Sequence, residues 1–267
     1  MLEPFEVLFE RDLPAYTLPD ELGRLYGRLG FPDRVVYSNF VSSLDGVVAL
    51  GSVASAGSVI SGKHAGDRFL MALLRACADA VVIGAGTMRA TPGHLWTPGH
   101  VFPDLAASFT ALRETLGRRP VPRLVVLTAK GELDLEHPAL QKGATILTTQ
   151  RGAERIGGRL PATCDVIILG RGRKLDLLLA FAELAGSGFK VILTEGGPQL
   201  VGGLIAAKLL DEAFLTLSPV IAGRAKERRL GMVEGVELLP FATVWSSLLS
   251  ARRHSDFLFL RYGLPRS

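Results

Sequence analysis

Cysteine is scarce in this sequence, and features that mark several large protein classes are missing. The 267 residues include two cysteines, Cys77 and Cys164, too few for a disulfide framework, and their apolar surroundings predict buried thiols. No uninterrupted apolar run approaches the roughly 20 residues that a membrane-spanning helix needs. The first residues carry acids and no apolar core segment, which is untypical of a signal peptide. These absences predict a soluble, cytoplasmic protein.

Positive and negative charges are also nearly balanced in number. Basic residues outnumber acidic ones by only 30 to 26, for a formal net charge of +4. The basic residues are dispersed and form no stripe interleaved with aromatic residues, which argues against nucleic-acid binding. A mild positive balance suits a small anionic substrate better. Hydrophobic residues make up 48% of the chain, enough for a sizeable buried core.

Short apolar runs alternate with helical periodicity along most of the chain. This alternation predicts an α/β fold, with a mostly parallel central sheet flanked by helices and an antiparallel C-terminal edge. We expect residues 1–33 to form an extension with one short helix, packed on a main domain of residues 34–267. Residues 51–62 and 223–235 are expected to be loops. The predicted strands are 35–41, 47–50, 79–83, 123–128, 144–148, 164–169, 191–194, 213–220, 245–250 and 256–262 (the last two joined by a turn at 251–255), and the predicted helices are 20–29, 63–76, 102–116, 175–185 and 198–210.

The stretch 191–204 holds the strongest local indication of a ligand site. A buried strand is followed by Glu195-Gly-Gly-Pro198 and then by an apolar pattern of helical spacing. The glycines permit positive φ and close backbone approach, and Pro198 suits the first turn of a helix. Backbone N–H groups at that helix start would favour a phosphate, while Glu195 would stand at the edge where open α/β sheets bind ligands. A tight strand-to-helix turn with a solvated Glu195 would explain the same residues.

A second glycine pair, Gly84-Ala-Gly86, follows the predicted strand 79–83 but does not complete a dinucleotide-binding fingerprint. Arg89 occupies the position of the third glycine. The turn could still bind a nucleotide in another geometry, with Arg89 favouring a 2′-phosphate, or Arg89 could be a plain surface cation. The nearby His94 and His100 have no convincing set of further ligands, so we expect no metal site.

Six short motifs occur in one order along the chain. They are Ser43-Leu-Asp-Gly46, Leu74-Arg-Ala76, Asp79-Ala-Val-Val-Ile-Gly-Ala-Gly-Thr-Met-Arg89, Thr194-Glu-Gly-Gly-Pro198, Leu209-Leu-Asp-Glu212 and Ser218-Pro-Val-Ile-Ala-Gly223. Each motif is weak alone, but the ordered set, spanning residues 34–262, resembles the RibD C-terminal family, the reductase domain of riboflavin biosynthesis. The His-x-Glu and Pro-Cys-x-x-Cys motifs of the deaminase half found in bifunctional enzymes are absent, which excludes zinc-dependent deamination.

The resemblance implies a dihydrofolate-reductase-like fold, a homodimer and NADPH as the cofactor. The implied reaction is that of a 5-amino-6-(5-phosphoribosylamino)uracil reductase, in which the sugar ring opens to an imine and hydride goes to the former anomeric carbon. Because the cofactor supplies the hydride, the protein has to orient it, polarise the C=N bond and provide a proton donor.

The resemblance also implies roles for individual residues. Glu195 is expected to act at the substrate, either by hydrogen-bonding the pyrimidine edge or by orienting the sugar. Arg75 matches an arginine that holds the substrate phosphate through its bidentate fork, although a cation there would also suit the end of a helix. Ser61 and Leu95 match further substrate contacts. The expected cofactor contacts are Val41, Ser42, Thr87, Thr91, Thr128, Gly196, Gly197, Pro198, Gln199 and Leu200.

Three departures from the family pattern leave the substrate open. Val47 stands where many of the pyrimidine reductases place Lys or Arg, Ala90-Thr91-Pro92 replaces an acidic run, and the basic residue that closes that loop is not evident. The pattern looks closer to a stand-alone bacterial branch. Three hypotheses follow: reduction of the riboflavin intermediate, NADPH-dependent reduction of dihydrofolate or another pterin, and NADPH binding without catalysis. Arg75 should be essential for the first and less so for the second.

Overall fold

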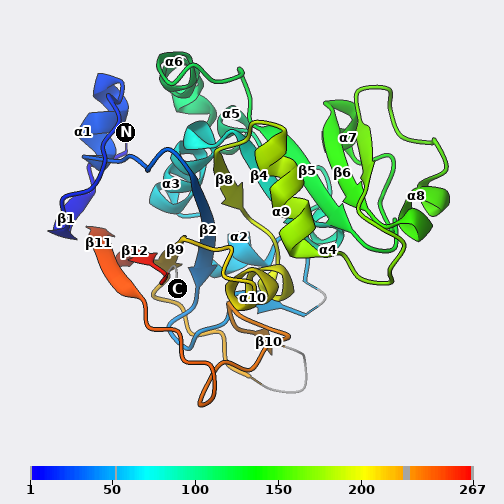
Figure 1. Ribbon diagram of the computed structural model, residues 1–267. Coiled ribbons are helices and arrows are strands. Elements are labelled where there is room, and N and C mark those ends of the chain that lie inside the picture. The colour runs from blue at the N-terminus through cyan, green and yellow to red at the C-terminus, as the bar shows by residue number, and fades with distance from the viewer. Residues whose placement is uncertain (1, 52, 225–228, 266–267) are drawn as a thin grey trace.

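The computed structural model of the protein describes residues 2–51, 53–224 and 229–265. Among these residues, one ten-stranded sheet dominates the molecule (Figure 1). Neighbouring strands are parallel from β9 to β7, and antiparallel pairs close the other edge. The predicted α/β fold with a mostly parallel sheet and an antiparallel C-terminal edge is therefore confirmed. The strand order is β1 (Glu6–Glu10), β11 (Ser247–His254), β12 (Phe257–Gly263), β9 (Glu212–Leu217), β2 (Val35–Ser42), β8 (Val191–Thr194), β4 (Ala80–Gly84), β5 (Arg123–Thr128), β6 (Ala144–Thr148) and β7 (Asp165–Ile168).

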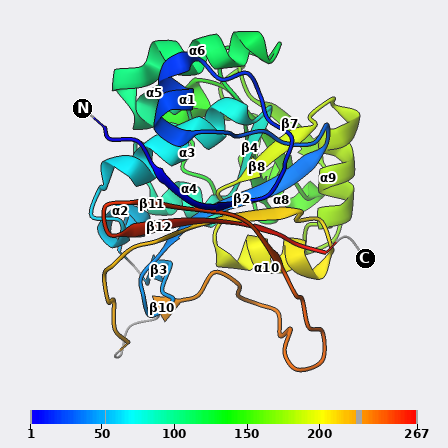
Figure 2. The same ribbon diagram turned by 90° about the vertical axis from the view of Figure 1, so that its left-hand side faces the viewer.

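Helices cover both faces of the sheet. Figure 2 shows α1, α5 and α6 on one side of the sheet and α10 on the other. The larger apolar core is shared with α1 (Asp20–Tyr26), α3 (Ala65–Cys77), α4 (Ala85–Ala90), α5 (Pro98–Val101), α6 (Ala106–Thr115), α7 (Pro138–Gln141) and α8 (Gln150–Ile156). The second core lies under α9 (Leu177–Gly186) and α10 (Pro198–Ala206). The remaining elements are α2 (Ala56–Ile60), η1 (Pro103–Leu105) and a small pair of strands, β3 (Ala49–Leu50) and β10 (Arg229–Leu230).

Helix α3 contributes both to the larger core and to the candidate active site. Its predicted apolar stripe, including Phe69, Leu70 and Leu74, is buried. The hydroxyl of Tyr37 on β2 donates to the backbone carbonyl of Leu74 at 2.7 Å, which fixes the helix over the centre of the sheet.

The N-terminal segment is joined to the sheet through a buried arginine. Strand β1, which was not predicted, pairs with β11. Arg252 on β11 donates to Glu10 Oε1 at 2.5 Å and to the carbonyl of Tyr26 at 2.9 Å, and its guanidinium lies 4.2 Å from the Tyr26 ring centroid. Paired this way, the charge can be buried inside the molecule.

Three local predictions were wrong. The expected loop 51–62 contains α2, and the loop 223–235 contains β10. The polar run 251–255 was expected to be a turn, but residues 251–254 belong to β11, since Arg252 is paired in the interior. Cys77 is fully buried as predicted, whereas Cys164 is only partly buried. Within the described ranges, no helix has both the length and the apolar character required to cross a membrane.

Candidate active site

The C-terminal ends of the parallel strands lie together at one edge of the sheet. Glu195 lies at this edge, as predicted from the sequence. Strands β2, β8 and β4 are neighbours here, and β5 lies next to β4. Glu195 follows directly after β8, Ser42 ends β2, and Thr128 ends β5. This edge is where open α/β sheets bind ligands.

A buried ion pair between Arg75 and Glu195 forms the centre of the site. Arg75 Nε donates to Glu195 Oε1 at 2.8 Å and Nη2 donates to Oε2 at 2.5 Å. Nη1 donates to the carbonyls of Leu95 and Thr97 at 3.3 and 3.5 Å, and Nη2 also meets His94 Nε2 at 2.9 Å. All five guanidinium N–H groups thus have partners, so a substrate phosphate would have to displace one of them to reach Arg75.

His94 is held in its neutral form by the same arginine. Burial, followed by the positive charge of Arg75, lowers the pKa of His94 to about 3. A neutral ring that accepts a hydrogen bond from Arg75 at Nε2 carries its own proton on Nδ1. His94 is therefore a fixed acceptor that orients the guanidinium toward Glu195.

Asp67, in the first turn of α3, is a site residue that the sequence analysis missed. Its carboxyl is buried and lies beside the hydroxyls of Ser61 and Thr216, close enough to Glu195 to feel its negative charge. Burial is the main cause that raises the pKa of Asp67 to about 6. A signal was present in the sequence, because Asp67 stands three residues before Leu70 and thus on the apolar stripe of its helix.

The turn after Glu195 brings two predicted cofactor contacts together. Pro198 is at the first turn of α10, as predicted, and Gly197 is its N-cap. The positive φ that glycine permits is not used at Gly196 or Gly197. A Cβ on Gly197 would lie 3.6 Å from the hydroxyl of Thr87, which is an ordinary van der Waals contact. The helix N-terminus and the β4–α4 turn therefore face each other across a narrow gap.

A family model of the RibD C-terminal domain matches residues 34–247. The chain belongs to this family. Its relatives include proteins named 2,5-diamino-6-ribosylamino-4(3H)-pyrimidinone 5′-phosphate reductase from Methanothermobacter thermautotrophicus and Archaeoglobus fulgidus. Each is 28% identical to this chain, over 76% and 70% of it and over 85% and 81% of their own lengths.

Solved structures support the fold of this RibD C-terminal domain. A pyrimidine reductase-like protein from Corynebacterium diphtheriae matches with a TM-score of 0.72 at 22% identity, covering 92% of this chain and 99% of that protein. RibD from Acinetobacter baumannii matches with a TM-score of 0.63 at 20% identity, covering 87% of this chain and 58% of that protein.

The other predicted site residues fall into separate places within the RibD C-terminal domain. Ser61 is buried beside Asp67. Thr91 donates to the carbonyl of Thr87 at 2.8 Å, so it lies at the turn after β4. Thr128 lies one strand further along, where its hydroxyl accepts from the backbone N–H of residue 131. The remaining residues are Val41, buried on β2, Ser42, which bonds the next carbonyl, Gln199, exposed on α10, and Leu200, packed against Gly196.

The turn after β2 joins two of the sequence motifs. The hydroxyl of Ser43 donates to Asp45 at 2.6 Å, and the N–H groups of Ala222 and Gly223 donate to the same carboxylate at 3.0 and 2.9 Å. These bonds, that of Ser43 first, lower the pKa of Asp45 to about 2. Val47, which replaces the usual cation, is fully buried in a small apolar cluster. Asp45 thus holds the chain segments around the end of β2.

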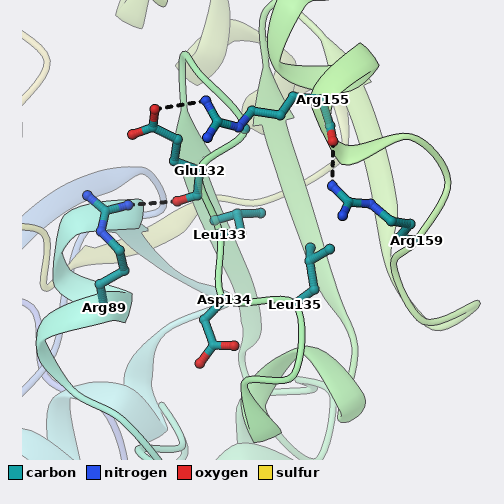
Figure 3. A pocket seen from close by; sticks show the side chains of 8 residues that line it. Arg89, Glu132, Leu133, Asp134, Leu135, Arg155 and Arg159 are labelled. Carbon is teal, nitrogen blue, oxygen red and sulfur yellow. Dashed lines mark hydrogen bonds and ion pairs between the residues drawn. The ribbon is translucent and has the colours of Figure 1, made fainter.

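A positively charged pocket of about 640 Å³ lies further along the same edge (Figure 3). Its walls follow the C-terminal ends of β4, β5 and β6. Arg89 donates to the carbonyl of Glu132 at 2.6 Å, and Arg155 donates to the Glu132 carboxylate at 2.9 Å. Arg159 and Asp134 complete the charged lining, so three guanidinium groups face two carboxylates. The pocket therefore favours anions.

Proposed function

We propose that this chain is a reductase of riboflavin biosynthesis that reduces the C=N bond of a ring-opened, 5′-phosphorylated ribosylamino-pyrimidine. The main support is the buried cluster of Arg75, Glu195 and Asp67 at the ligand edge of a RibD C-terminal domain. The cluster lies beside the turn that begins α10, so a substrate there would adjoin a bound cofactor. Relatives named as pyrimidine phosphate reductases support the same chemistry.

A nicotinamide cofactor supplies the hydride for such a reduction. The turn from Glu195 to Pro198 fits its diphosphate, because Gly197 leaves the gap beside Thr87 open at the N-terminus of α10, where the helix dipole favours a negative charge. A Cβ at position 197 would fill this gap. NADPH is the proposed form, because the pocket containing Arg89 and Arg155 follows the same strand ends and suits an additional phosphate.

Two phosphorylated pyrimidines are candidates for the substrate. The resemblance implied the uracil, which carries a carbonyl at ring position 2, whereas the relatives' names specify an amino group there. A carboxylate accepts hydrogen bonds from an amino group and not from a carbonyl. Because the Glu195 carboxyl lies on this face, we propose the diamino-pyrimidinone as the preferred form and the uracil as the weaker one.

We also propose that the chain acts as a homodimer, as the resemblance implies. The loop 231–246 supports this proposal, since it extends away from the sheet next to α10 (Figure 2). Its side chains Leu239, Phe241 and Trp245 are 67%, 88% and 83% exposed. Large apolar groups that are exposed together are typical of protein interfaces.

The test is NADPH oxidation, followed by its absorbance, with purified protein and three substrates in parallel. These are the phosphorylated diamino-pyrimidinone, the phosphorylated uracil and dihydrofolate. We expect turnover of the phosphorylated pyrimidines, fastest with the diamino form, and none with dihydrofolate.

Preference for dihydrofolate would contradict the proposal and make this a pterin reductase on the same fold. NADPH binding without oxidation by any of the three would favour the non-catalytic hypothesis. Removal of the phosphate from the pyrimidine should raise KM, because Arg75 or another cation at this edge would lose its partner.

A further inference from the structure

We propose that Asp67 donates the proton to the imine nitrogen of the substrate, a role that rests on the proposed reductase function. The other polar side chains of the cluster are poor donors. Arg75 uses every N–H group on fixed partners, and an arginine does not give up its proton. Both carboxyl oxygens of Glu195 already accept hydrogen bonds from that arginine, and the neutral His94 has only an imidazole N–H, which is a very weak acid.

The geometry around Asp67 points to a ligand. The side chain is 4% exposed, and no described cation pairs with its carboxyl. Two further polar atoms on the same side of the sheet, Thr216 Oγ1 and Asn39 Oδ1, are buried without a hydrogen-bond partner among the described residues. Asn39 lies two residues beyond Tyr37, so its side chain is on the α3 face as well. Buried polar atoms of this kind cost free energy until a ligand or water pairs with them.

The chemical step requires one hydride and one proton. A bound reduced nicotinamide would supply the hydride for the new C–H bond at the former anomeric carbon. The π electrons of the C=N bond move to nitrogen, which takes the proton of the Asp67 carboxyl. Nitrogen becomes an amine, the cofactor is oxidised, and Asp67 is left as a carboxylate that regains a proton from water.

The protonation behaviour of Asp67 supports this role. Burial first, and the charge of Glu195 in addition, raise the pKa of Asp67 to about 6, against the lowering effect of the nearby Thr216 and Ser61 hydroxyls. A carboxyl of this kind holds its proton in part near neutral pH, as a general acid must. The other charged or titratable groups around it are Arg75 and His64 at the two ends of α3, and His94 behind Arg75.

A structural role is the alternative that the test has to separate. Asp67 is in the first turn of α3, where a negative charge favours the helix dipole. Asp20 occupies the same kind of position in α1 and is exposed, so Asp20→Asn is a matched control.

The experiment compares the wild type with Asp67→Asn, Asp67→Glu and Asp20→Asn. It measures the pH dependence of kcat/KM with the phosphorylated diamino-pyrimidinone, and NADPH affinity by fluorescence titration. The wild-type value is expected to fall as pH rises above about 6, because the acid loses its proton. Asp67→Asn should lower kcat by roughly 10²–10³-fold, abolish this limb of the profile and leave NADPH affinity within about twofold. Asp67→Glu should restore part of the activity and the limb, and Asp20→Asn should match the wild type.

Two results would overturn the role of Asp67. One is an Asp67→Asn enzyme that keeps kcat within about threefold of the wild type, and the other is one that keeps the same pH limb at lower activity. Failure of the proposed function looks different, since the wild type itself would then reduce neither pyrimidine.

Discussion

Asp67 and Glu195 are two carboxyl groups on the same face of the sheet, and their surroundings give them different states. Glu195 accepts two hydrogen bonds from Arg75. Asp67 has no described cation beside it, and burial first, with the nearby Glu195 in addition, raises its pKa, so its proton is held more tightly. A pair of carboxyls separated in this way can divide acid and anion roles between them.

The pH dependence of stability tests the state of Asp67 without any substrate. Its folded-state pKa of about 6 lies above the ordinary 3.8, so its stabilising contribution is complete below about pH 4 and is lost as pH rises through 6. Asn stays neutral throughout. Relative to the wild type, Asp67→Asn should therefore gain up to about 3 kcal/mol of unfolding free energy between pH 4 and pH 8.

Urea unfolding at several pH values measures this gain, with Asp20→Asn as the control for the loss of an exposed acidic group in a first helical turn. A difference between Asp67→Asn and the wild type that stays constant with pH would contradict the raised pKa.

The Arg75–Glu195 pair allows a double-mutant test. Either Arg75→Met or Glu195→Gln leaves a buried polar or charged group without its partner and should cost about 3–5 kcal/mol. The double variant should cost clearly less than the sum of the two, because it leaves neither charge unpaired. Unfolding free energies from denaturant titrations of all four proteins measure the coupling. Additive costs would show that the pair does not act as one unit.

Elements far apart in the chain are held together by close backbone contacts and buried arginines. Residues 1–33 pack on the sheet through Arg252 and Arg261, which donates to the carbonyl of Gly30 at 3.0 Å. Gly30 itself lies so close to the preceding loop that a Cβ would be 2.5 Å from the carbonyl oxygen of Pro14. This contact is between backbones, which cannot move aside as a side chain can.

Gly30→Ala is therefore expected to displace the loop around Pro14 and to destabilise the protein by roughly 1–3 kcal/mol. Limited proteolysis should cut residues 1–33 faster in this variant, while the rest of the chain stays resistant. Gly186→Ala is the matched control, since a Cβ there meets nothing within 4 Å, and it should be neutral or slightly stabilising. Unchanged cleavage in Gly30→Ala would contradict the close packing.

The pocket in Figure 3 is built from segments after three neighbouring strands, and it tests the choice of cofactor. If it holds the additional phosphate of NADPH, Arg89→Ala should lower the preference for NADPH over NADH by about tenfold, the effect of one charge-assisted hydrogen bond. The exposed Arg173 lies outside the pocket, so Arg173→Ala should leave the preference unchanged. The ratio of kcat/KM values for the two cofactors is the measurement. Equal losses with both cofactors would place the phosphate elsewhere.

At the scale of the whole molecule, the sheet has one antiparallel edge, and the loop 231–246 carries several exposed apolar side chains. Phe241 and Trp245 on this loop contact little of their own chain. If they lie in a homodimer interface, light scattering of the wild type should give twice the chain mass of 28.6 kDa. The double variant Phe241→Ser with Trp245→Ser should shift that mass toward the monomer, with unchanged circular dichroism. A monomeric wild type would contradict the homodimer.

The sequence alone determined the central strands and the position of Glu195. Strands β5, β6 and β8 have the predicted bounds, because runs of Val, Ile and Leu that are buried on both faces can be recognised locally. Glu195 and Pro198 were located for the same reason, since the strand-to-helix turn is a short-range feature. The order of six motifs identified the family.

Only the tertiary structure decided which side chains meet and in what state. Arg75 and Glu195 are 120 residues apart, and no local pattern shows that the arginine faces a carboxylate. Strand β1, the buried Arg252 and the raised pKa of Asp67 depend equally on distant partners. Local sequence determines where an apolar strand forms, but the cost of burying a charge depends on what the rest of the fold brings beside it.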